Sequence, residues 1–211
     1  MTYISNEQIE NMHHLYRINL INSCTGFKSA NLIGTKSKHG IDNVAVFSSV
    51  IHLGSHPPLL GFILRPTTVL RNTYENIKET GVYTINHIHK NSIEDAHHTS
   101  AKYGNTISEF DVTNLTPEFK NNCYAPFVQD APVQLEMAYL NEYEIKENDT
   151  ILVVGKLVGL YINQDILEKD GFINLSKAEI ASINGLDTYT IPKFEKRLAY
   201  QRPKEVKTKH I

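Results

Sequence analysis

The stretch that decides the fold is residues 42–76, which read DNVAVFSSVIHLGSHPPLLGFILRPTTVLRNTYEN. Its first part, 43–51, is a β-branched and aromatic run that predicts a strand buried over much of its surface. A second apolar run, 59–64, predicts another strand. Pro57 and Pro58 lie between the two runs and predict a stiff turn, because proline cannot donate to a strand ladder. A helix is expected at about 69–79, after the second strand.

Polar side chains gather where these elements end. Ser48 and Ser49 follow the first strand, and Arg65 follows the second, just before the expected helix. A helix N-terminus offers free N–H groups and the positive end of a dipole, so hydroxyls and an arginine beside it form a candidate phosphate site. Each residue also has an ordinary interpretation, with the serines at a strand end and Arg65 paired with a surface carboxylate.

Composition limits the classes of protein to consider. The chain has 211 residues, 41% of them hydrophobic and 21% charged, which is typical of one globular domain spanning 1–211. Its formal charge of −2 gives no reason to expect a nucleic acid partner. No apolar run approaches the roughly 20 residues of a membrane span, and the N-terminus lacks the features of a signal peptide. We therefore expect a cytoplasmic protein without a membrane partner.

The rest of the chain adds strands and few helices. Cys24 and Cys123 stand far apart without C-x-x-C spacing, which argues against a zinc ribbon or a disulfide scaffold. Gly155 and Gly159, inside a long apolar strand, predict a bulge or bend. The expected elements are helices at 5–16 and 90–103, strands at 30–35, 82–87, 133–145 and 151–162, an excursion at 104–132 with one helical turn near Pro117, irregular chain beyond Gly171, and an extended basic tail from about 190. Residues 17–27 fit either a strand or a helical turn.

This order of elements predicts a mainly β (α+β) fold, an antiparallel Greek-key split β-barrel with a few peripheral helices. Many strand segments occur without the βαβ rhythm of a Rossmann sheet. The chain also lacks G-x-G-x-x-G and P-loop motifs.

Several short motifs occur in an order found in one known family. They are Asn43-x-Ala45-x-Phe47-Ser48-Ser49-Val50, Pro57-Pro58-Leu59-x-Gly61-Phe62, Arg65-Pro66, Thr73-x-x-Asn76-Ile77, Gly81-x-Tyr83-x-Ile85-Asn86, Ser100-Ala101-Lys102-Tyr103 and Ser108-Glu109-Phe110-Asp111. Over roughly residues 28–165 the chain resembles the flavin reductase-like family of FMN-binding split barrels, specifically its flavoredoxin-like branch.

The resemblance implies FMN as cofactor and a set of residues around it. It implies that Asn43, Ala45 and Phe47 lie along the flavin edge, that Ser48 and Ser49 meet the ribityl chain or phosphate, and that Arg65 binds the phosphate. Ser100 and Lys102 would complete this shell, together with Asn86 and His98. The paired histidines 97 and 98 depart from many relatives in the segment that supplies the phosphate side. The family also implies a homodimer with FMN near the subunit interface.

The implied activity is an FMN-dependent oxidoreductase that passes electrons from NADH or NADPH through FMN to a small-molecule or protein acceptor. Because the flavin carries the chemistry, no side chain is expected to be catalytic. The alternatives are an FMN-binding electron carrier without its own NAD(P)H oxidation and a purely structural barrel. The sequence leaves open the donor, the acceptor and whether FMN stays bound or exchanges as a substrate.

A metal site is the remaining rival. His87, His89, His97, His98 and Glu94 lie within a dozen residues. Adjacent residues on a helix diverge by about 100°, so His97 and His98 would point apart. His87 and His89 would share one face of a strand end without a third ligand. We therefore expect no metal.

Overall fold

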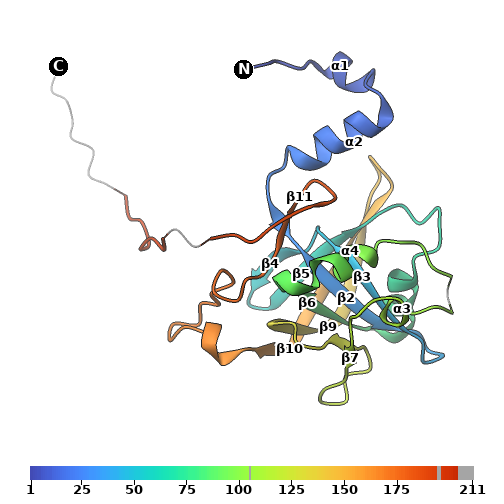
Figure 1. Cartoon of the computed structure of the whole chain (residues 1–211), viewed down its shortest axis with the longest axis vertical. Helices are drawn as coiled ribbons and strands as arrows, with labels where there is room; N and C mark the ends of the chain where they lie inside the picture. Colours follow the sequence, from blue (N-terminus) through green and yellow to red (C-terminus); the bar gives the residue numbers. More distant parts are fainter. Residues whose placement is uncertain (105, 194–195, 204–211) are drawn as a thin grey trace.

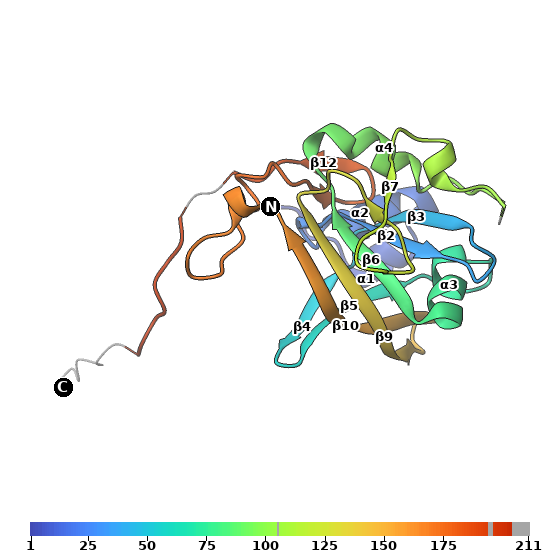
Figure 2. The ribbon, with the colours of Figure 1, turned by 90° about the horizontal axis from the view of Figure 1, so that it is seen from below.

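The computed structural model describes residues 1–104, 106–193 and 196–203. Its main sheet is antiparallel, with the strand order β3-β2-β6-β9-β10-β5-β4 (Figures 1 and 2). The strands are β2 (Asn31–Lys36), β3 (Asp42–Phe47), β4 (Ile51–Ser55), β5 (Pro58–Leu64), β6 (Val82–His87), β9 (Val133–Ile145) and β10 (Thr150–Ile162). The prediction of a mainly β, antiparallel split barrel is confirmed.

The predicted first strand is in fact two. β3 ends at Phe47, the chain bends through residues 48–50, and β4 begins at Ile51. β4 then pairs with β5 through a turn at His56 and Pro57. The expectation that Pro58 interrupts the ladder is wrong, because β5 begins at Pro58, the first position of a strand, where proline is tolerated.

A side chain joins the bend after β3 to strand β5. The hydroxyl of Ser49 donates to the Ile63 carbonyl at 3.1 Å and accepts from the Ile63 N–H at 3.1 Å. Ser49 lies in the bend after β3, and Ile63 lies on β5. The Ser49 hydroxyl thus takes the place of a backbone pair at the seam between β3 and β5.

The long hairpin of β9 and β10 carries the predicted irregularities. Register shifts occur between Val154 and Gly155 and between Leu157 and Gly159. A Cβ at position 155 would collide with the hydroxyl of Tyr83, which is fully buried and has no hydrogen-bond partner among the described residues. Glycine at 155 therefore makes room for a core tyrosine.

Two small sheets form in segments that were expected to be irregular. β1 (Lys28–Ser29), β11 (Ser182–Asn184) and β12 (Thr188–Thr190) form one, so the chain beyond Gly171 is more regular than expected. β7 (Pro117–Glu118) and β8 (Phe127–Val128) form the other, where a helical turn was expected. The helical turn of the excursion is instead the 3₁₀ helix η2 (Glu109–Asp111).

The helices are shorter than the sequence patterns predict. The N-terminal segment forms α1 (Asn6–Glu10) and α2 (His14–Ser23), which rise away from the barrel (Figure 1). α3 (Asn72–Thr80) ends at Gly81, which has the predicted left-handed conformation. The expected helix at 90–103 is η1 (Lys90–Ser92) followed by α4 (Ile93–His98). None of the described helices is long and apolar enough to span a membrane.

Apolar side chains fill the barrel and a second layer outside it. Phe62, Tyr83 and Met137 are among the residues packed inside the barrel. Val44 and Val46 face the other way from β3 and pack with Ala96 of α4 and Phe110 of η2. α4 and η2 therefore cover the outer side of β3.

The start of the C-terminal tail is held by the chain itself. Arg197 pairs with Glu168 at 3.1 Å and Asp170 at 2.7 Å, and its guanidinium lies 4.2 Å from the centre of the Phe172 ring. These residues belong to the loop after η3 (Gln164–Ile166). Residues 204–211 of the predicted basic tail lie outside the described residues.

Candidate functional site

A buried polar network fixes α3 against the β2–β3 hairpin. The Asn43 amide donates to Thr35 Oγ1 at 3.3 Å and to Thr73 Oγ1 at 3.1 Å. The Asn76 amide donates to the same Thr35 hydroxyl at 3.0 Å. All four side chains are buried. Hydrogen bonds between buried groups hold a unique geometry, since any displacement leaves a donor unpaired.

A cavity of about 280 Å³ lies beside this network. The β2–β3 turn, the start of α3, and Thr106 and Ile107 line it. Its lining residues are Ser37, His39, Ile41, Asp42, Asn43, Leu70, Asn72, Glu75, Asn76, Thr106 and Ile107. Asn43 is the predicted flavin-edge residue in this wall, and Thr106 follows Lys102 by four positions. Asn43 is the only one of the ten predicted site residues among those that line this cavity.

The start of α3 is open to an anion. Its N-cap residue is Arg71, whose side chain makes no capping hydrogen bond. The first N–H groups of a helix have no partners within it, so this end keeps free donors and the positive end of the dipole. Leu70 and Asn72, on either side of Arg71, both line the cavity.

Arg71 itself was missed by the sequence analysis. Its Nε atom is buried and has no hydrogen-bond partner among the described residues. A buried unpaired donor on a charged group is costly, so an orphan of this kind indicates a missing acceptor. The only signal in the sequence was its place immediately before the helix motif Thr73-x-x-Asn76. Arg65 was predicted as the phosphate ligand instead, because it follows a strand and precedes the helix.

Two predicted cations have no ion-pair partner among the described residues. Arg65 and Lys102 are both exposed. Arg65 follows Ile63 by two residues, and the bonds from Ser49 to Ile63 bring the serine bend close to it. The hydroxyl of Ser49 is already engaged with the backbone, whereas the half-buried Ser48 makes no side-chain hydrogen bond to the described residues.

The other predicted residues fall into different settings. Ala45 is half-buried on β3, and Phe47 packs edge-on against Phe62 with ring centres 5.1 Å apart. Ser100 is exposed just after α4, and His98 Nε2 lies 2.6 Å from the Tyr103 hydroxyl. The structure does not bring these four into one cluster with the cavity, although α4 packs on β3.

Asn86 has a structural role. Its amide donates to the Leu32 carbonyl at 3.2 Å and to Thr84 Oγ1 at 3.0 Å, and its oxygen accepts from the Val128 N–H at 3.0 Å. The side chain is fully buried between β2, β6 and β8. Because its polar atoms already have partners, we leave Asn86 out of the proposed flavin shell.

Glu109 begins η2, two residues after Ile107 of the cavity wall. It is only 6% exposed, and its Oε2 accepts from the Val44 N–H at 3.1 Å. β3 pairs only with β2, so this contact satisfies a donor on the free edge of the strand. Burial raises the pKa of the Glu109 carboxyl, and the backbone hydrogen bonds only partly offset that effect.

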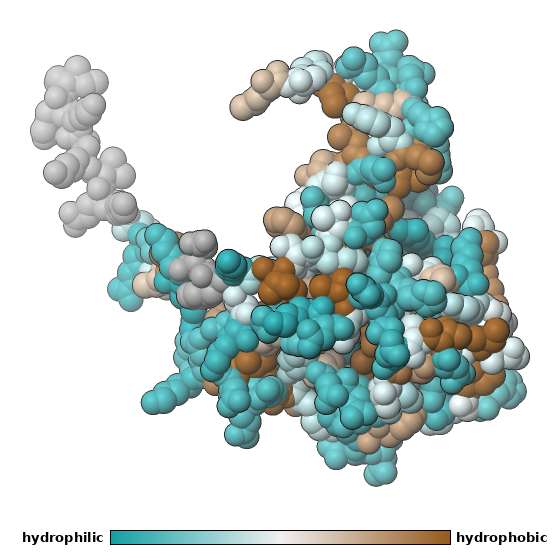
Figure 3. Space-filling view, in the orientation of Figure 1, coloured by the Kyte–Doolittle hydropathy of each residue, from teal (hydrophilic) through white to brown (hydrophobic). Residues whose placement is uncertain are grey.

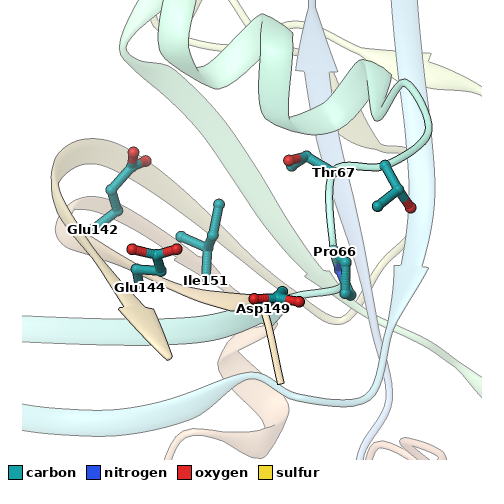
Figure 4. A pocket seen from close by; sticks show the side chains of 7 residues that line it. Pro66, Thr67, Glu142, Glu144, Asp149 and Ile151 are labelled. Atoms are coloured by element: carbon teal, nitrogen blue, oxygen red, sulfur yellow. The ribbon is translucent and has the colours of Figure 1, made fainter. Parts of the chain in front are cut away.

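A larger cavity of about 490 Å³ lies elsewhere and is acidic (Figure 4). Glu142, Glu144 and Asp149 line it opposite Thr67 and Thr68. Burial raises the pKa of Glu142, but hydrogen bonds from Lys78, Tyr74 and Tyr139 outweigh it and lower the pKa. These three carboxylates disfavour a phosphate more than the two in the smaller cavity, Asp42 and Glu75, of which Asp42 is paired with Lys36 at 3.2 Å.

The histidines of the metal alternative point to separate partners. His97 contacts the Tyr189 hydroxyl at 3.2 Å, and His89 Nδ1 accepts from the Asn91 N–H at 3.3 Å. Burial lowers the pKa of His87 to about 4, so it is neutral near pH 7. In the described part of the chain, no three His, Cys, Asp or Glu side chains are grouped to hold a metal ion.

Curated relatives match about two thirds of the chain. An uncharacterized protein of Methanothermobacter thermautotrophicus is 30% identical over 151 residues, which cover 69% of each chain. An uncharacterized protein of Aquifex aeolicus is 26% identical over 147 residues, which cover 69% of this chain and 74% of that protein.

Solved structures share the fold. A candidate flavin reductase with a split barrel domain from Shewanella frigidimarina is 41% identical, with a TM-score of 0.92 over 95% of this chain and 100% of that chain. Nitrilotriacetate monooxygenase component B of Bacillus cereus is 18% identical, with a TM-score of 0.81 over 94% and 98%. Flavoredoxin of Desulfovibrio vulgaris is 21% identical, with a TM-score of 0.69 over 82% and 90%. The family model of the flavin reductase like domain matches residues 27–178, and the chain belongs to this family.

Proposed function

We propose that the protein binds FMN at the 280 Å³ cavity, with the phosphate at the start of α3, and that it oxidises NADH or NADPH. The observation that carries this proposal is Arg71, a half-buried cation whose buried Nε has no hydrogen-bond partner among the described residues, at a helix N-terminus without a side-chain cap. Both features suit a phosphate, which brings acceptors for the guanidinium and for free N–H groups.

The surrounding residues contact different parts of FMN in this proposal. Arg71 holds the phosphate, and Asn43, which lines the cavity, lies along the flavin edge. The family resemblance alone adds Ala45 and Phe47 to the flavin edge, and Ser48, Ser49, Arg65, His98, Ser100 and Lys102 to the ribityl and phosphate shell, because these residues do not line the cavity. Thr35, Thr73 and Asn76 keep Asn43 and the helix start in place through the buried network.

FMN, when bound, supplies the electron transfer, accepting hydride from the nicotinamide and passing electrons to an acceptor. The protein groups position it and exclude water. Because the flavin supplies the electron transfer, no side chain of the cavity wall is assigned a catalytic role.

The test compares FMN with riboflavin, which lacks the phosphate. A charged hydrogen bond contributes about 1.5–3 kcal/mol, so Arg71→Met should weaken FMN at least about tenfold and leave riboflavin nearly unchanged. Arg65→Ala should act in the same direction. Arg197→Met is the matched control, because it removes a guanidinium that is paired elsewhere with Glu168 and Asp170. Equal losses of both ligands would contradict the phosphate assignment.

Anaerobic addition of NADH and NADPH to the FMN-loaded protein tests the oxidoreductase activity. Bleaching of the flavin absorbance by one of them supports a reductase. Tight FMN binding without bleaching by either would favour the alternative, an FMN-binding electron carrier reduced by another protein.

We also propose that the protein is a homodimer, as the family resemblance implies. Its support in this chain is the amount of apolar surface that the described residues leave uncovered.

A further inference from the structure

Two aromatic side chains are exposed on the loop between β7 and β8. Phe119 is 49% exposed and Tyr124 is 41% exposed. The loop projects from the lower end of the barrel in Figure 1, and in Figure 3 this end of the molecule shows hydrophobic side chains between hydrophilic ones. Single exposed apolar residues are common on protein surfaces, so the two rings carry meaning only if the fold holds them together.

One ammonium group contacts both rings. Lys36 Nζ lies 4.5 Å from the centre of the Phe119 ring and 5.8 Å from the centre of the Tyr124 ring. Both distances are within the roughly 6 Å range of a cation–π contact. The ammonium is itself held by Asp42 at 3.2 Å. The two rings therefore form one surface feature, which we call the aromatic pair (Phe119 and Tyr124).

The backbone on either side of Phe119 is anchored. Glu118 and Lys120, its two neighbours, form an ion pair at 2.9 Å. Lys120 also donates to the buried Gln134 side chain on β9 at 2.7 Å, and its ammonium lies 4.9 Å from the centre of the Tyr161 ring. The position of the Phe119 ring is thus fixed by contacts to the main sheet.

The backbone on either side of Tyr124 is anchored as well. Cys123 and Ala125, its two neighbours, are both buried. The next residue, Pro126, accepts a hydrogen bond from the Thr84 hydroxyl at 2.6 Å through its carbonyl. A ligand that binds to rings already held in place loses little side-chain freedom in the protein, which favours affinity.

The aromatic pair lies beside the 280 Å³ cavity. The Tyr124 hydroxyl donates to the Ser37 carbonyl at 2.8 Å, and Ser37 lines that cavity. Asp42, which holds the Lys36 ammonium between the cavity and the rings, lines it too. A molecule that reaches into the cavity can therefore also touch the two rings.

The charges around the aromatic pair are balanced. Lys36 is paired with Asp42, and Lys120 is paired with Glu118. A phosphate or a nucleic acid backbone is normally bound by cations that are free to pair with it. The rings are thus better suited to a neutral planar group.

We propose that the aromatic pair binds the adenine ring of the nicotinamide donor. The inference rests on the proposed function, the oxidation of NADH or NADPH by FMN in the cavity. Each donor carries two planar rings, joined through two riboses and a pyrophosphate. The nicotinamide must reach the flavin, so the adenine binds outside the cavity, and the aromatic pair offers it a face there. Adenine is neutral near pH 7, and bases commonly stack on aromatic side chains.

The first experiment compares NADH and NADPH with reduced nicotinamide mononucleotide, which lacks the adenosine half. Stopped-flow reduction of the FMN-loaded protein at increasing donor concentration gives a dissociation constant and a limiting rate for each donor. The natural chain should bind the preferred dinucleotide at least about fivefold more tightly than the mononucleotide. Equal dissociation constants would overturn the inference.

Phe119→Ser and Tyr124→Ser each remove one ring. Each should raise the dissociation constant of the dinucleotide by about fivefold to 150-fold, change the limiting rate by less than about twofold and leave the mononucleotide unaffected. Phe119→Tyr keeps a ring and should behave like the natural chain. Tyr143→Ser is the matched control, because Tyr143 is 57% exposed on β9, outside the aromatic pair and the cavity wall. A dinucleotide constant that stays unchanged in either Phe119→Ser or Tyr124→Ser would overturn the inference.

The flavin itself is the other planar group that could stack here. FMN binding to Phe119→Ser is therefore titrated in parallel and should match the natural chain. A loss of FMN affinity equal to the loss of dinucleotide affinity would assign the aromatic pair to the flavin and overturn the adenine site.

ADP-ribose, which has the adenine but no nicotinamide, separates this inference from the proposed function. In calorimetric titrations it should bind the natural chain and lose affinity in Phe119→Ser and Tyr124→Ser. That result in a protein whose flavin neither NADH nor NADPH reduces would refute the proposed function and leave the adenine site standing. Flavin reduction by a dinucleotide without measurable ADP-ribose binding would leave the proposed function standing and overturn the adenine site.

Discussion

Replacing Thr35 with valine removes a hydroxyl that two buried amides share. Thr35 is fully buried, and its Oγ1 accepts from Asn76 at 3.0 Å and from Asn43 at 3.3 Å. Valine has nearly the same shape, so the change creates no cavity but leaves two N–H donors unpaired. A buried donor that loses its acceptor costs about 1–3 kcal/mol.

We expect Thr35→Val to lower the free energy of unfolding by about 2–4 kcal/mol, because the longer of the two bonds lies at the weak end of that range. For a domain of this size, 1 kcal/mol corresponds to about 2–4 °C, so the melting temperature should fall by about 4–16 °C. Equilibrium urea unfolding and thermal scans measure both values.

The matched control is Thr188→Val, the same change at an exposed position of β12. It should change stability by less than about 0.5 kcal/mol. If Thr35→Val were as mild as this control, the network would not be what holds α3 to the hairpin, and the reasoning would fail.

Three further predictions concern the core, a buried carboxylate and the flavin chemistry. Gly155→Ala should destabilise the fold by about 1–3 kcal/mol, and adding Tyr83→Phe should recover part of that loss in urea unfolding, because the new methyl group meets the tyrosine hydroxyl. Since burial raises the folded-state pKa of Glu109, its contribution to stability is fully present below the unfolded-state pKa and is lost as pH rises through the folded-state value. Glu109→Gln should therefore gain stability relative to the natural chain as pH rises from about 4, the ordinary range of a glutamate, through the raised folded-state pKa, and a difference that does not vary with pH would contradict this. His98→Gln, saturated with FMN, should be reduced by the preferred nicotinamide at a rate within a few-fold of the natural chain in stopped-flow measurements, whereas loss of an acid or base typically costs about 10²–10⁴-fold.

Much of the barrel could be predicted from the sequence. The apolar runs at 59–64 and 151–162 identified β5 and β10, and Gly81 marked the end of α3 correctly. The failures lie where local pattern and tertiary contacts disagree. β11 and β12 are only three residues each and form through pairing with one another and with β1, a contact over long sequence distance.

The candidate site was predicted only in part for the same reason. Asn43 was placed at the site by its motif, and it does line the cavity. Motif spacing does not reveal that Asn86 is enclosed by three backbone and side-chain partners, nor that Arg71 has a buried Nε without one. Both facts depend on which neighbours the folded chain brings within hydrogen-bond distance.

The seam at Ser49 restricts which residues that position tolerates. One atom there both donates to the Ile63 carbonyl and accepts from the Ile63 N–H. Among uncharged side chains that fit a strand bend, only the hydroxyls of serine and threonine combine both capacities on one small group. Ser48, without such a bond, is free of this demand. Although residues 48 and 49 are both serines, position 49 should thus accept only Ser or Thr. Position 48 can change with the ligand that the site binds.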